Sequence, residues 1–494
     1  MSDRTDCRNP LAPETTPARK RSFAGKVLSE LGLVSLWESS RDVKLLCAQR
    51  FVRMLGYGVS TLILVAYLDA LGNRKTAIGL FMSLTLAGDI CISFFLTLFA
   101  DAVGRKAILA LGALLMTGSG VVFAFFNAYW ILLLAAVLGV ISPNGNEIGP
   151  FRAIEESIVA HLTLPEARGD IYAWYSLFGV AGAAFGILIC GWALQFFTQV
   201  LHWDLLFSYR AIFILYALVG FIKLCLTVFL SGSVESEKKQ QQKKQTLRRG
   251  NETTPLLAGD RPNDEQGVSA EATDKRGVWK LLPDIHKDSV TVVTVLCFLF
   301  GLDAFGTAVN PLSWITYYFQ WRFDIEKGEL GSIFFTTHII SAMSTLAASS
   351  IAKRLGNVNT MVLTHLPSQV FRALIGVPDN VHLALLFCLL NASMTSMDTA
   401  PRSAFLATII LPEERTAVMG TLNVVKTTAS SLGPIITGVL VDHDLYWVSF
   451  LLGGTLKGLY DIGILIFFRH KEKEMEKRER DRIRRQEEEE EGDN

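Results

Sequence analysis

Long apolar stretches constrain the fold of this chain more than any other feature. A helix needs about 20 apolar residues to cross a bilayer, and it satisfies its own backbone hydrogen bonds while doing so. Twelve stretches of this kind occur, at 45–69, 77–99, 107–127, 129–160, 170–197, 209–230, 289–319, 329–351, 358–377, 381–410, 415–440 and 446–469. They predict an all-α polytopic membrane protein with two six-helix bundles.

Polar segments divide the chain into domains. Hydrophobic residues make up 50% of the chain and charged residues only 19%, a composition that excludes a soluble globular domain. The zero net charge gives no indication of a nucleic-acid partner. We expect an N-terminal tail, an N-terminal bundle, a disordered linker, a C-terminal bundle and a charged C-terminal tail, at 1–44, 45–230, 231–288, 289–469 and 470–494.

The orientation in the membrane follows from the basic residues. An even number of crossings places both termini on one side. Lys and Arg collect where the tails and the linker meet the spans, for example at Arg41, Lys44, Lys287 and Arg469, so the positive-inside rule predicts that these segments are cytosolic. The short loops favour this orientation only weakly. None of the seven cysteines falls in a predicted outer loop, so we expect no disulfide.

The two halves of the chain contain matching motifs. The motif at 164–168 (LPEAR) recurs at 411–415 (LPEER), and the same spacing pairs Gly186 with Gly433 and Gly191 with Gly438. Six plus six spans with an internal repeat predict two pseudo-symmetric bundles and favour a transporter. The alternative is that the repeat records only a gene duplication.

The loop between spans 2 and 3 carries a recognisable motif. Residues 101–106 (DAVGRK) resemble the D-x-x-G-R-K signature of the major facilitator superfamily (MFS), although Thr97 and Ala102 depart from the usual pattern. The resemblance covers about 45–469 and implies the twelve-helix MFS fold. It also implies that a gating motif latches the two halves in one state, through Asp101, Gly104, Arg105 and Lys106. A plain basic anchor is the alternative.

Further motifs narrow the resemblance. The segments 360–368 (TMVLTHLPS), 397–402 (MDTAPR), 411–415 (LPEER) and 456–461 (LKGLYD) resemble a subgroup of bacterial and fungal members. This similarity bears on the fold and not on the cargo.

Charged residues inside the spans mark the candidate site. A charge that faces lipid costs about 2.5–3.5 kcal/mol on insertion scales, so such residues face a wet cavity or one another. Most lie in spans 1, 4, 7 and 10, which the resemblance places around a central cavity. The candidates for a cavity that binds substrate or couples to protons are Arg53, Glu147, Arg152, Asp303, Asp398, Arg402 and Lys426.

The repeat suggests partners for these charges. Arg53 and Asp303 each stand three residues before a repeat-related glycine, so we expect them to face each other across the pseudo-two-fold axis, as a pair that breaks during transport or as a static salt bridge. Lys426 either holds an anionic substrate or pairs with Asp398. In span 12, Lys457 and Asp461 are expected to neutralise each other at i,i+4.

Two spans contain helix breakers at corresponding positions. Span 4 reads SPNGNEIGP at 142–150, and span 10 reads NASMTSMDTAPR at 391–402. Proline removes a backbone donor and glycine weakens a helix, so both spans should be interrupted. Interrupted spans at corresponding positions of two repeats point to a binding site, although a purely architectural kink would give the same pattern.

Glu147, Asp303 and Asp398 are the candidates for proton coupling. A carboxylate in a cavity that opens to alternate sides can take up a proton on one side and release it on the other. The alternative for each is a fixed pair with Arg53, Arg152, Arg402 or Lys426.

The linker contains a pattern that fits a known sorting signal. Glu252, Leu256 and Leu257 form the acidic dileucine pattern E-x-x-x-L-L, which sorting adaptor complexes read in cytosolic segments. It favours a vacuolar or lysosomal-type membrane over the plasma membrane, the competing location.

These features predict a secondary active transporter of a small polar or ionisable solute that works by alternating access, with proton coupling as an option. A transport-inactive sensor with the same fold is the alternative. No nucleophile–base arrangement, phosphate loop or Cys/His cluster is present, so we expect no enzyme, cofactor or metal.

Overall fold

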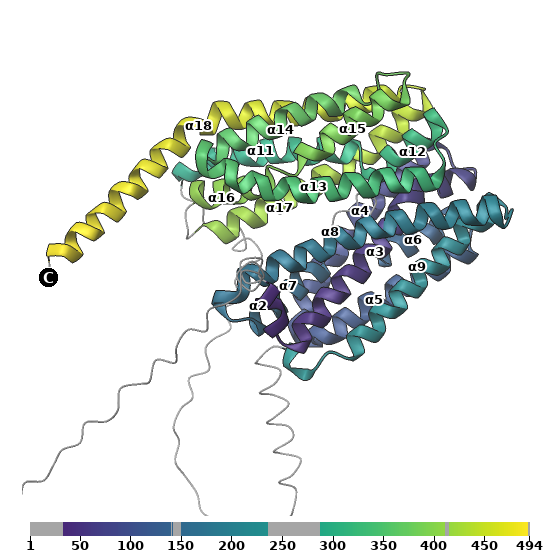
Figure 1. Ribbon diagram of the computed structural model, residues 1–494, viewed down its shortest axis with the longest axis horizontal. Coiled ribbons are helices and arrows are strands. Elements are labelled where there is room, and N and C mark those ends of the chain that lie inside the picture. Colours follow the sequence, from purple (N-terminus) through teal and green to yellow (C-terminus); the bar gives the residue numbers. More distant parts are fainter. Residues whose placement is uncertain (1–32, 140, 142–149, 236–286, 411–413, 493–494) are drawn as a thin grey trace, which may run out of the picture.

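The computed structural model describes residues 33–139, 141, 150–235, 287–410 and 414–492, and every regular element in these ranges is a helix (Figure 1). The N-terminal half contains α2 (Leu33–Glu38), α3 (Arg41–Ala70), α4 (Lys75–Val103), α5 (Arg105–Phe125), α6 (Tyr129–Leu138), α7 (Pro150–Leu162), α8 (Pro165–Gln195), η1 (Phe196–Val200), α9 (Leu205–Val228) and η2 (Gly232–Val234). The C-terminal half contains α11 (Lys287–Val309), α12 (Leu312–Phe323), α13 (Lys327–Leu355), α14 (Asn357–Leu374), α15 (Val381–Thr395), α16 (Thr399–Ile409), α17 (Arg415–Asp442) and α18 (Tyr446–Gly492).

These helices confirm the twelve predicted crossings. Nine helical stretches among the described residues are long and apolar enough to cross a membrane. The pair α6/α7, together with α13 and α14, supplies the other three crossings. Two of the crossings consist of two shorter helices each, namely α11/α12 and α15/α16. The all-α polytopic fold with two six-helix bundles is therefore confirmed.

Local sequence explains where several helices begin. Ser40 precedes α3 and accepts a hydrogen bond from the Val43 amide, and Asp204 does the same for the Leu206 amide at α9. Asn380 accepts from the amides of His382 and Leu383 at α15. Such side chains satisfy amide groups that the first turn of a helix leaves without partners.

The two bundles repeat one packing pattern. In the N-terminal bundle, α3 packs against α8 and α9, and α5 packs against α9. In the C-terminal bundle, α11 packs against α17 and α18, and α14 packs against α18. The repeat-related glycines allow this packing, because Gly186 lies against the backbone of Leu55 and Gly433 against that of Ala308. The bundles are therefore pseudo-symmetric in contacts as well as in sequence.

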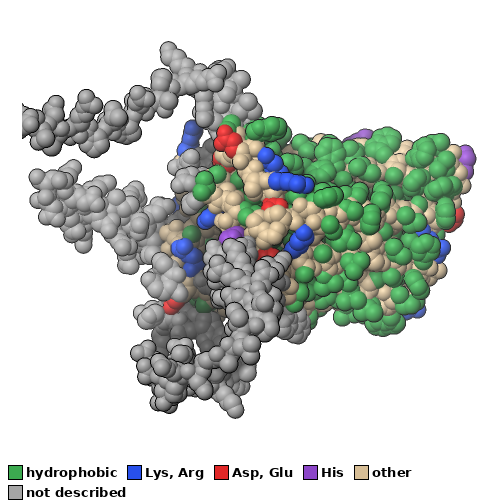
Figure 2. Space-filling view, turned by 90° about the horizontal axis from the view of Figure 1, so that it is seen from below, with side chains coloured by type: hydrophobic (Ala, Val, Ile, Leu, Met, Phe, Trp, Pro, Cys, Tyr) green, Lys and Arg blue, Asp and Glu red, His purple; other side chains and the backbone are tan. Residues whose placement is uncertain are grey.

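The outer surface of the bundles is apolar. Figure 2 shows hydrophobic side chains over most of the visible face, with charged side chains mainly at its two ends. Large exposed side chains include Phe125, Trp130, Phe298 and Ile466. A surface of this kind fits the hydrocarbon core of a bilayer and not water.

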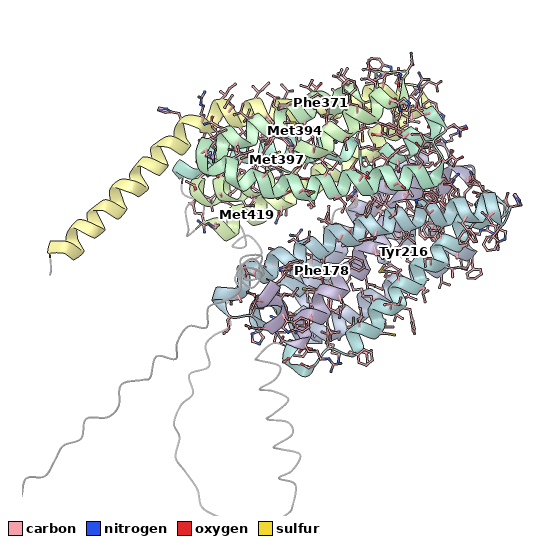
Figure 3. All side chains as sticks on the ribbon, in the orientation of Figure 1. Phe178, Tyr216, Phe371, Met394, Met397 and Met419 are labelled. Carbon is pink, nitrogen blue, oxygen red and sulfur yellow. The ribbon has the colours of Figure 1, made fainter. Side chains whose placement is uncertain are left out.

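The bundles meet mainly along two helix pairs, α4 with α17 and α8 with α13, and α3 also contacts α12. They diverge toward the end at which α2, the end of α9 and the start of α11 lie, which we call the tail end, and they meet at the opposite end, the far end (Figure 1). Figure 3 places Met419 of α17 and Phe178 of α8 on opposite bundles where the two diverge.

Glycines bring the bundles together near the far end. A Cβ atom on Gly191 would lie 3.0 Å from the Cα atom of Gly331, and one on Gly79 would lie 3.1 Å from the Cα atom of Gly438. Gly191 and Gly438 are the pair that the sequence repeat relates. Their shared role is thus close approach of the two bundles.

Polar contacts also join the bundles at the far end. The carboxylate of Asp442 accepts hydrogen bonds from the Lys75 and Thr76 amides at the start of α4, at 3.0 and 2.8 Å. In the pseudo-symmetric position, Gln195 Oε1 accepts from the Gly328 amide at the start of α13, at 3.0 Å. Each bundle therefore caps a helix of the other.

The last helix extends well beyond the membrane. Helix α18 continues from Tyr446 to Gly492, so the charged C-terminal tail prolongs the last span. It projects away from the bundles at the tail end (Figure 1).

Candidate functional site

A cavity of about 550 Å³ lies between the two bundles. Helices α3, α7 and α8 line it from one side, and helices α11 to α16 line it from the other. Its polar wall residues are Arg50, Arg152, Ser176, Thr307, Asn310, Thr337, His338, Ser341, Thr345, Arg372, Asn391, Thr395, Ser396 and Thr399. A cavity that both bundles line changes shape when the bundles move relative to each other.

Broken helices border the cavity, because freed backbone groups must face polar groups or water. Helix α15 ends at Thr395 and α16 begins at Thr399, and both residues line the cavity. The interruption expected in span 10 is therefore present. Helix α6 ends at Leu138 and α7 begins at Pro150, but most of the residues between them lie outside the described ranges.

A further break, between α11 and α12, was not expected. Asn310 and Pro311 separate these helices, and both line the cavity. The Asn310 side chain is held by Ser449, since Nδ2 donates to the Ser449 carbonyl at 2.7 Å and Oδ1 accepts from the Ser449 hydroxyl at 2.9 Å. The Asn-Pro dipeptide is a known helix-breaking signal, so the sequence contained the information.

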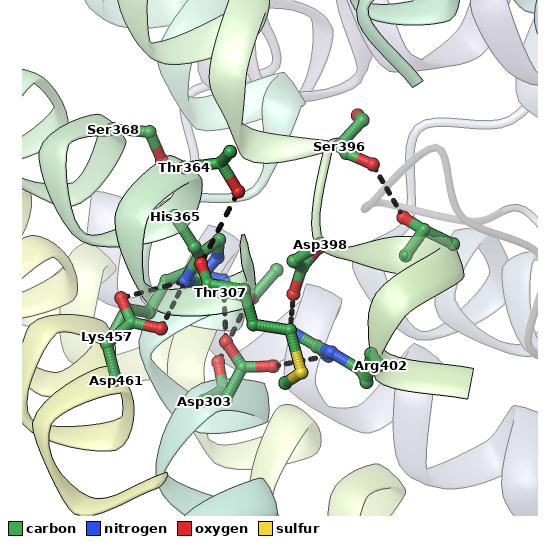
Figure 4. A network of polar contacts seen from close by, with 12 residues as sticks. Asp303, Thr307, Thr364, His365, Ser368, Ser396, Asp398, Arg402, Lys457 and Asp461 are labelled. Carbon is green, nitrogen blue, oxygen red and sulfur yellow. Dashed lines mark hydrogen bonds and ion pairs between the residues drawn. The ribbon is translucent and has the colours of Figure 1, made fainter. Parts of the chain in front are cut away.

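Asp303 lies at the centre of a buried ion-pair network in the C-terminal bundle (Figure 4). Its Oδ1 is 2.7 Å from Lys457 Nζ, and its Oδ2 is 3.0 Å from Arg402 Nη1. Arg402 also contacts the carboxylate of Asp398. The predicted residues Asp303, Asp398 and Arg402 therefore come together, with Lys457 as an additional member.

A second buried pair lies beside this network. His365 Nδ1 contacts both carboxylate oxygens of Asp461, at 2.8 and 2.9 Å. The expectation that Lys457 and Asp461 neutralise each other is therefore wrong. Each contacts a partner on a neighbouring helix instead, Lys457 with Asp303 of α11 and Asp461 with His365 of α14.

The N-terminal bundle has its own buried cluster. Arg53 Nη2 lies 2.7 Å from Glu155 Oε2, and Lys223 Nζ lies 3.8 Å from Glu155 Oε1. The Tyr175 hydroxyl donates to Glu155 at 2.5 Å. Arg53 and Asp303 thus pair within their own bundles, and the expectation that they face each other is wrong.

The other predicted site residues that the structure describes, Arg152 and Lys426, form no ion pair with members of these networks. Arg152 lines the cavity and contacts Glu156 at 2.7 Å. Lys426 lies over the Phe300 ring, 5.9 Å from its centroid, and makes no ion pair with a described residue. Asp398 contacts Arg402 instead, so the pair expected between Lys426 and Asp398 is wrong. Glu147 lies outside the described residues.

Thr307 connects the cavity to the C-terminal network. It lines the cavity, and its Oγ1 accepts a hydrogen bond of 2.7 Å from Lys457 Nζ. Lys457 also contacts Asp303. A ligand that engages Thr307 would therefore compete directly with a member of the buried network.

Sequence reasoning missed Arg372 and His338 as wall residues, whereas Asn391 belongs to the stretch 391–402 that pointed to a binding site. Arg372 and His338 come from α14 and α13, which supply part of the cavity wall. Asn391 is buried and donates from Nδ2 to the Ser368 carbonyl at 2.8 Å. The charge of Arg372 inside predicted span 9 was the available signal. It was missed because the cavity was expected to be lined by spans 1, 4, 7 and 10.

The loop motif between α4 and α5 lies at the tail end. Gly104 has a φ of 112°, a backbone conformation that glycine adopts without strain. Lys106 Nζ donates to the carbonyls of Val228 and Leu230, at 2.9 and 2.5 Å, which satisfies the end of α9. The Arg105 amide donates to Glu235 at 2.9 Å. Nothing is described of the Asp101 side chain.

The sorting motif of Glu252, Leu256 and Leu257 lies outside the described residues, as does most of the linker.

The fold and the cavity define an integral multi-pass membrane protein of two helical bundles around a polar chamber. The family model described as Major Facilitator Superfamily matches residues 46–390 and 296–489. The chain belongs to this superfamily.

Relatives support the assignment. The uncharacterized membrane protein YJR124C of Saccharomyces cerevisiae is 36% identical over 427 residues, which are 85% of this chain and 92% of that protein. The multidrug resistance protein MdtH of Yersinia pestis is 29% identical over 187 residues, which cover 38% of this chain and 44% of the relative.

Solved structures share the fold. The D-xylose-proton symporter is 16% identical, with a TM-score of 0.62 over 85% of this chain and 96% of that chain. The nucleoside transporter NupG is 14% identical, with a TM-score of 0.61 over 87% and 99% of the two chains.

Proposed function

We propose that this protein is a secondary transporter that moves a small polar solute through the cavity by alternating access. The observation that carries the proposal is a polar cavity lined by both bundles, with the bundles in contact at the far end and apart at the tail end. Rocking of two pseudo-symmetric bundles about such a site exposes it to each side in turn.

The buried ion pairs favour this function over a purely structural one. The clusters around Asp303 and Glu155 lie inside the bundles, directly behind the cavity walls. Charges are costly in this position, and Thr307 joins one cluster to the wall.

Flux measurements test the proposal. Purified full-length protein in proteoliposomes is expected to show saturable counterflow of a solute that binds the cavity, and protein-free vesicles are expected to show none. Ligand binding without flux across a panel of bound solutes would instead favour a transport-inactive sensor.

Proton coupling is the finer part of the proposal. Both oxygens of Asp303 contact cations and Asp398 contacts Arg402, so a proton could enter either carboxylate only when these pairs separate. Glu147→Gln, Asp303→Asn and Asp398→Asn each serve as tests. Coupling through these residues is excluded if uptake by all three variants follows a pH gradient as wild-type uptake does.

We further propose that the tails and linker are cytosolic and that the dileucine motif directs the protein to a vacuolar or lysosomal-type membrane. A fluorescent fusion in which Leu256 and Leu257 are replaced by Ala should move to the plasma membrane. If the location of this fusion is unchanged, the proposed sorting role of the motif is refuted.

A further inference from the structure

The described part of the cavity wall carries positively charged side chains. Among the described residues that line it, Arg50, Arg152 and Arg372 are cationic and none is Asp or Glu. Arg152 contacts Glu156, which lies outside the wall. The remaining polar groups are Ser, Thr, Asn and His side chains. A lining of this composition attracts an anion more than a neutral sugar or a cation.

Of these three cations, Arg372 bears most directly on what the cavity binds. Its residue is only 8% exposed, and its Nε and Nη1 atoms are buried without a hydrogen-bond partner among the described residues. No described carboxylate forms an ion pair with it, and Asp303, with which it interacts electrostatically, is in contact with Lys457 and Arg402. Buried charges are normally paired and hydrogen-bonded.

The geometry of the Arg372 guanidinium group indicates which kind of ligand can accept its hydrogen bonds. Its planar fork presents several N–H groups that match the two oxygens of a carboxylate or the oxygens of a phosphate. Because Arg372 lines the cavity, such a ligand can reach it from the chamber. The volume of about 550 Å³ is that of a small-molecule site.

Neighbouring groups can bind the rest of the ligand. His338 Nδ1 donates to the Phe334 carbonyl at 2.9 Å, which leaves Nε2 as an acceptor in the neutral ring. Ser396 and Ser341 share a hydrogen bond of 2.5 Å, and both line the cavity. These groups suit hydroxyl or amide groups on an otherwise polar ligand.

We propose that the solute is a small organic anion, with its carboxylate or phosphate group bound by Arg372. This inference rests on the proposed transport function and names the class of its substrate. Arg372 and the wall around it belong to the C-terminal bundle, so the anion would be held mainly by one bundle while the other closes over it.

Binding measurements on detergent-purified full-length protein test the inference. The probes are lactate, succinate, inorganic phosphate and glycerol 3-phosphate, with the neutral solutes glycerol and glucose as comparison, and the readout is the shift in thermal unfolding. We expect at least one anion and neither neutral solute to stabilise the wild-type protein. Comparison of inorganic phosphate with the organic anions shows whether the organic part is needed.

Variants assign the effect to Arg372. In Arg372→Gln the binding anion should bind roughly 10- to 100-fold more weakly, as expected for the loss of a hydrogen bond to a charged group. Arg372→Lys should retain part of the affinity. Arg322→Gln is the matched control, because Arg322 contacts Asp379 outside the cavity wall, and it should bind like wild type.

The unfolding temperature measured without ligand tests whether Arg372 has only a structural role. If Arg372 awaits an anion, Arg372→Met should unfold at the same temperature as wild type or higher, since it removes an unpaired buried charge. A large drop in the unfolding temperature of this variant would overturn the inference. The inference is equally overturned if no anion stabilises the wild-type protein, or if Arg372→Gln retains full anion affinity.

Counterflow distinguishes this inference from the transport proposal. If only a neutral solute shows saturable flux, the transport proposal stands and the proposal of an anionic substrate is refuted. Anion binding by way of Arg372 without flux would support the site and refute transport.

Discussion

Buried charges decide stability at the scale of single residues. Asp303 contacts both Lys457 and Arg402 within a bundle interior. Replacing one member of a buried ion pair leaves its partner charged and uncompensated in a medium of low polarity. This costs more free energy than replacing both members by apolar residues. The network is therefore cooperative, and its members should not behave independently.

Asp303→Asn should lower stability by about 3–5 kcal/mol, because it leaves Lys457 without an anionic partner. Adding Lys457→Met should recover part of this loss, since the uncompensated cation is then removed. Thermal unfolding of the two single variants and the double variant gives the coupling energy. A double variant as unstable as the sum of its parts would contradict the pairing.

Thr307 offers a different test, because it touches both cavity and network. Thr307→Val removes one acceptor from Lys457 but leaves Asp303, so stability should fall by only about 1 kcal/mol. Solute flux should nevertheless decrease severalfold. Thr294→Val is the matched control on the same helix, since the Thr294 hydroxyl is exposed and donates only to the Val290 carbonyl. Equal flux in the two variants would contradict the role of Thr307.

At the scale of helices, the far end is closed by contacts between termini. The Asp442 carboxylate caps the start of α4, and its pseudo-symmetric counterpart Gln195 caps α13. A carboxylate at a helix N-terminus gains from the helix dipole as well as from the hydrogen bonds. The two contacts differ in charge, so the α4 contact should be the stronger one.

Asp442→Asn should therefore weaken the closed far end and raise the population of the opposite state. Ile315, which lines the cavity from α12, is replaced by Cys in a chain without its seven native cysteines. Labelling of this cysteine by an impermeant maleimide from the far side should then be faster. Asp444→Asn is the control, as Asp444 lies in the same turn with a φ of 60° that Asn also tolerates. Equal labelling rates in the two variants would contradict the cap.

The helices themselves were predictable from sequence, but their partners were not. Apolar length and the breakers at 391–402 identify spans and an interruption, because these are local properties. Which cation meets Asp303 depends on how each helix is rotated against its neighbours. Repeat symmetry relates Arg53 to Asp303 as equivalents, and equivalent positions in two bundles need not touch. The pairs actually formed, Arg53 with Glu155 and Asp303 with Lys457, follow from tertiary packing.

The whole molecule is two similar bodies that touch along α4–α17 and α8–α13. Glycines at both contacts, Gly79 with Gly438 and Gly191 with Gly331, allow backbones to approach closely. Interfaces of small residues hold by van der Waals packing without interlocking side chains. Such surfaces can separate and re-form with little rearrangement, as rocking of the bundles demands.

Covalent closure of one interface should therefore stop transport altogether. Ser83 Oγ of α4 accepts a hydrogen bond of 3.1 Å from the Ile435 amide of α17, which places the two positions within reach of a disulfide. In the cysteine-free chain, Ser83→Cys with Ile435→Cys should lose flux on oxidation and regain it with reductant.

The control joins Ala304 of α11 and Ser430 of α17, both changed to Cys, because these helices pack within one bundle and the Ser430 hydroxyl donates to the Ala304 carbonyl at 3.3 Å. Rocking leaves distances inside a bundle unchanged, so oxidation of this pair should not affect flux. If flux survives in the oxidised Ser83–Ile435 variant, and gel mobility shows that the cross-link is complete, the bundles do not separate at α4–α17. Rigid-body alternating access would then be excluded, because rocking of the two bundles separates α4 from α17 at the far end.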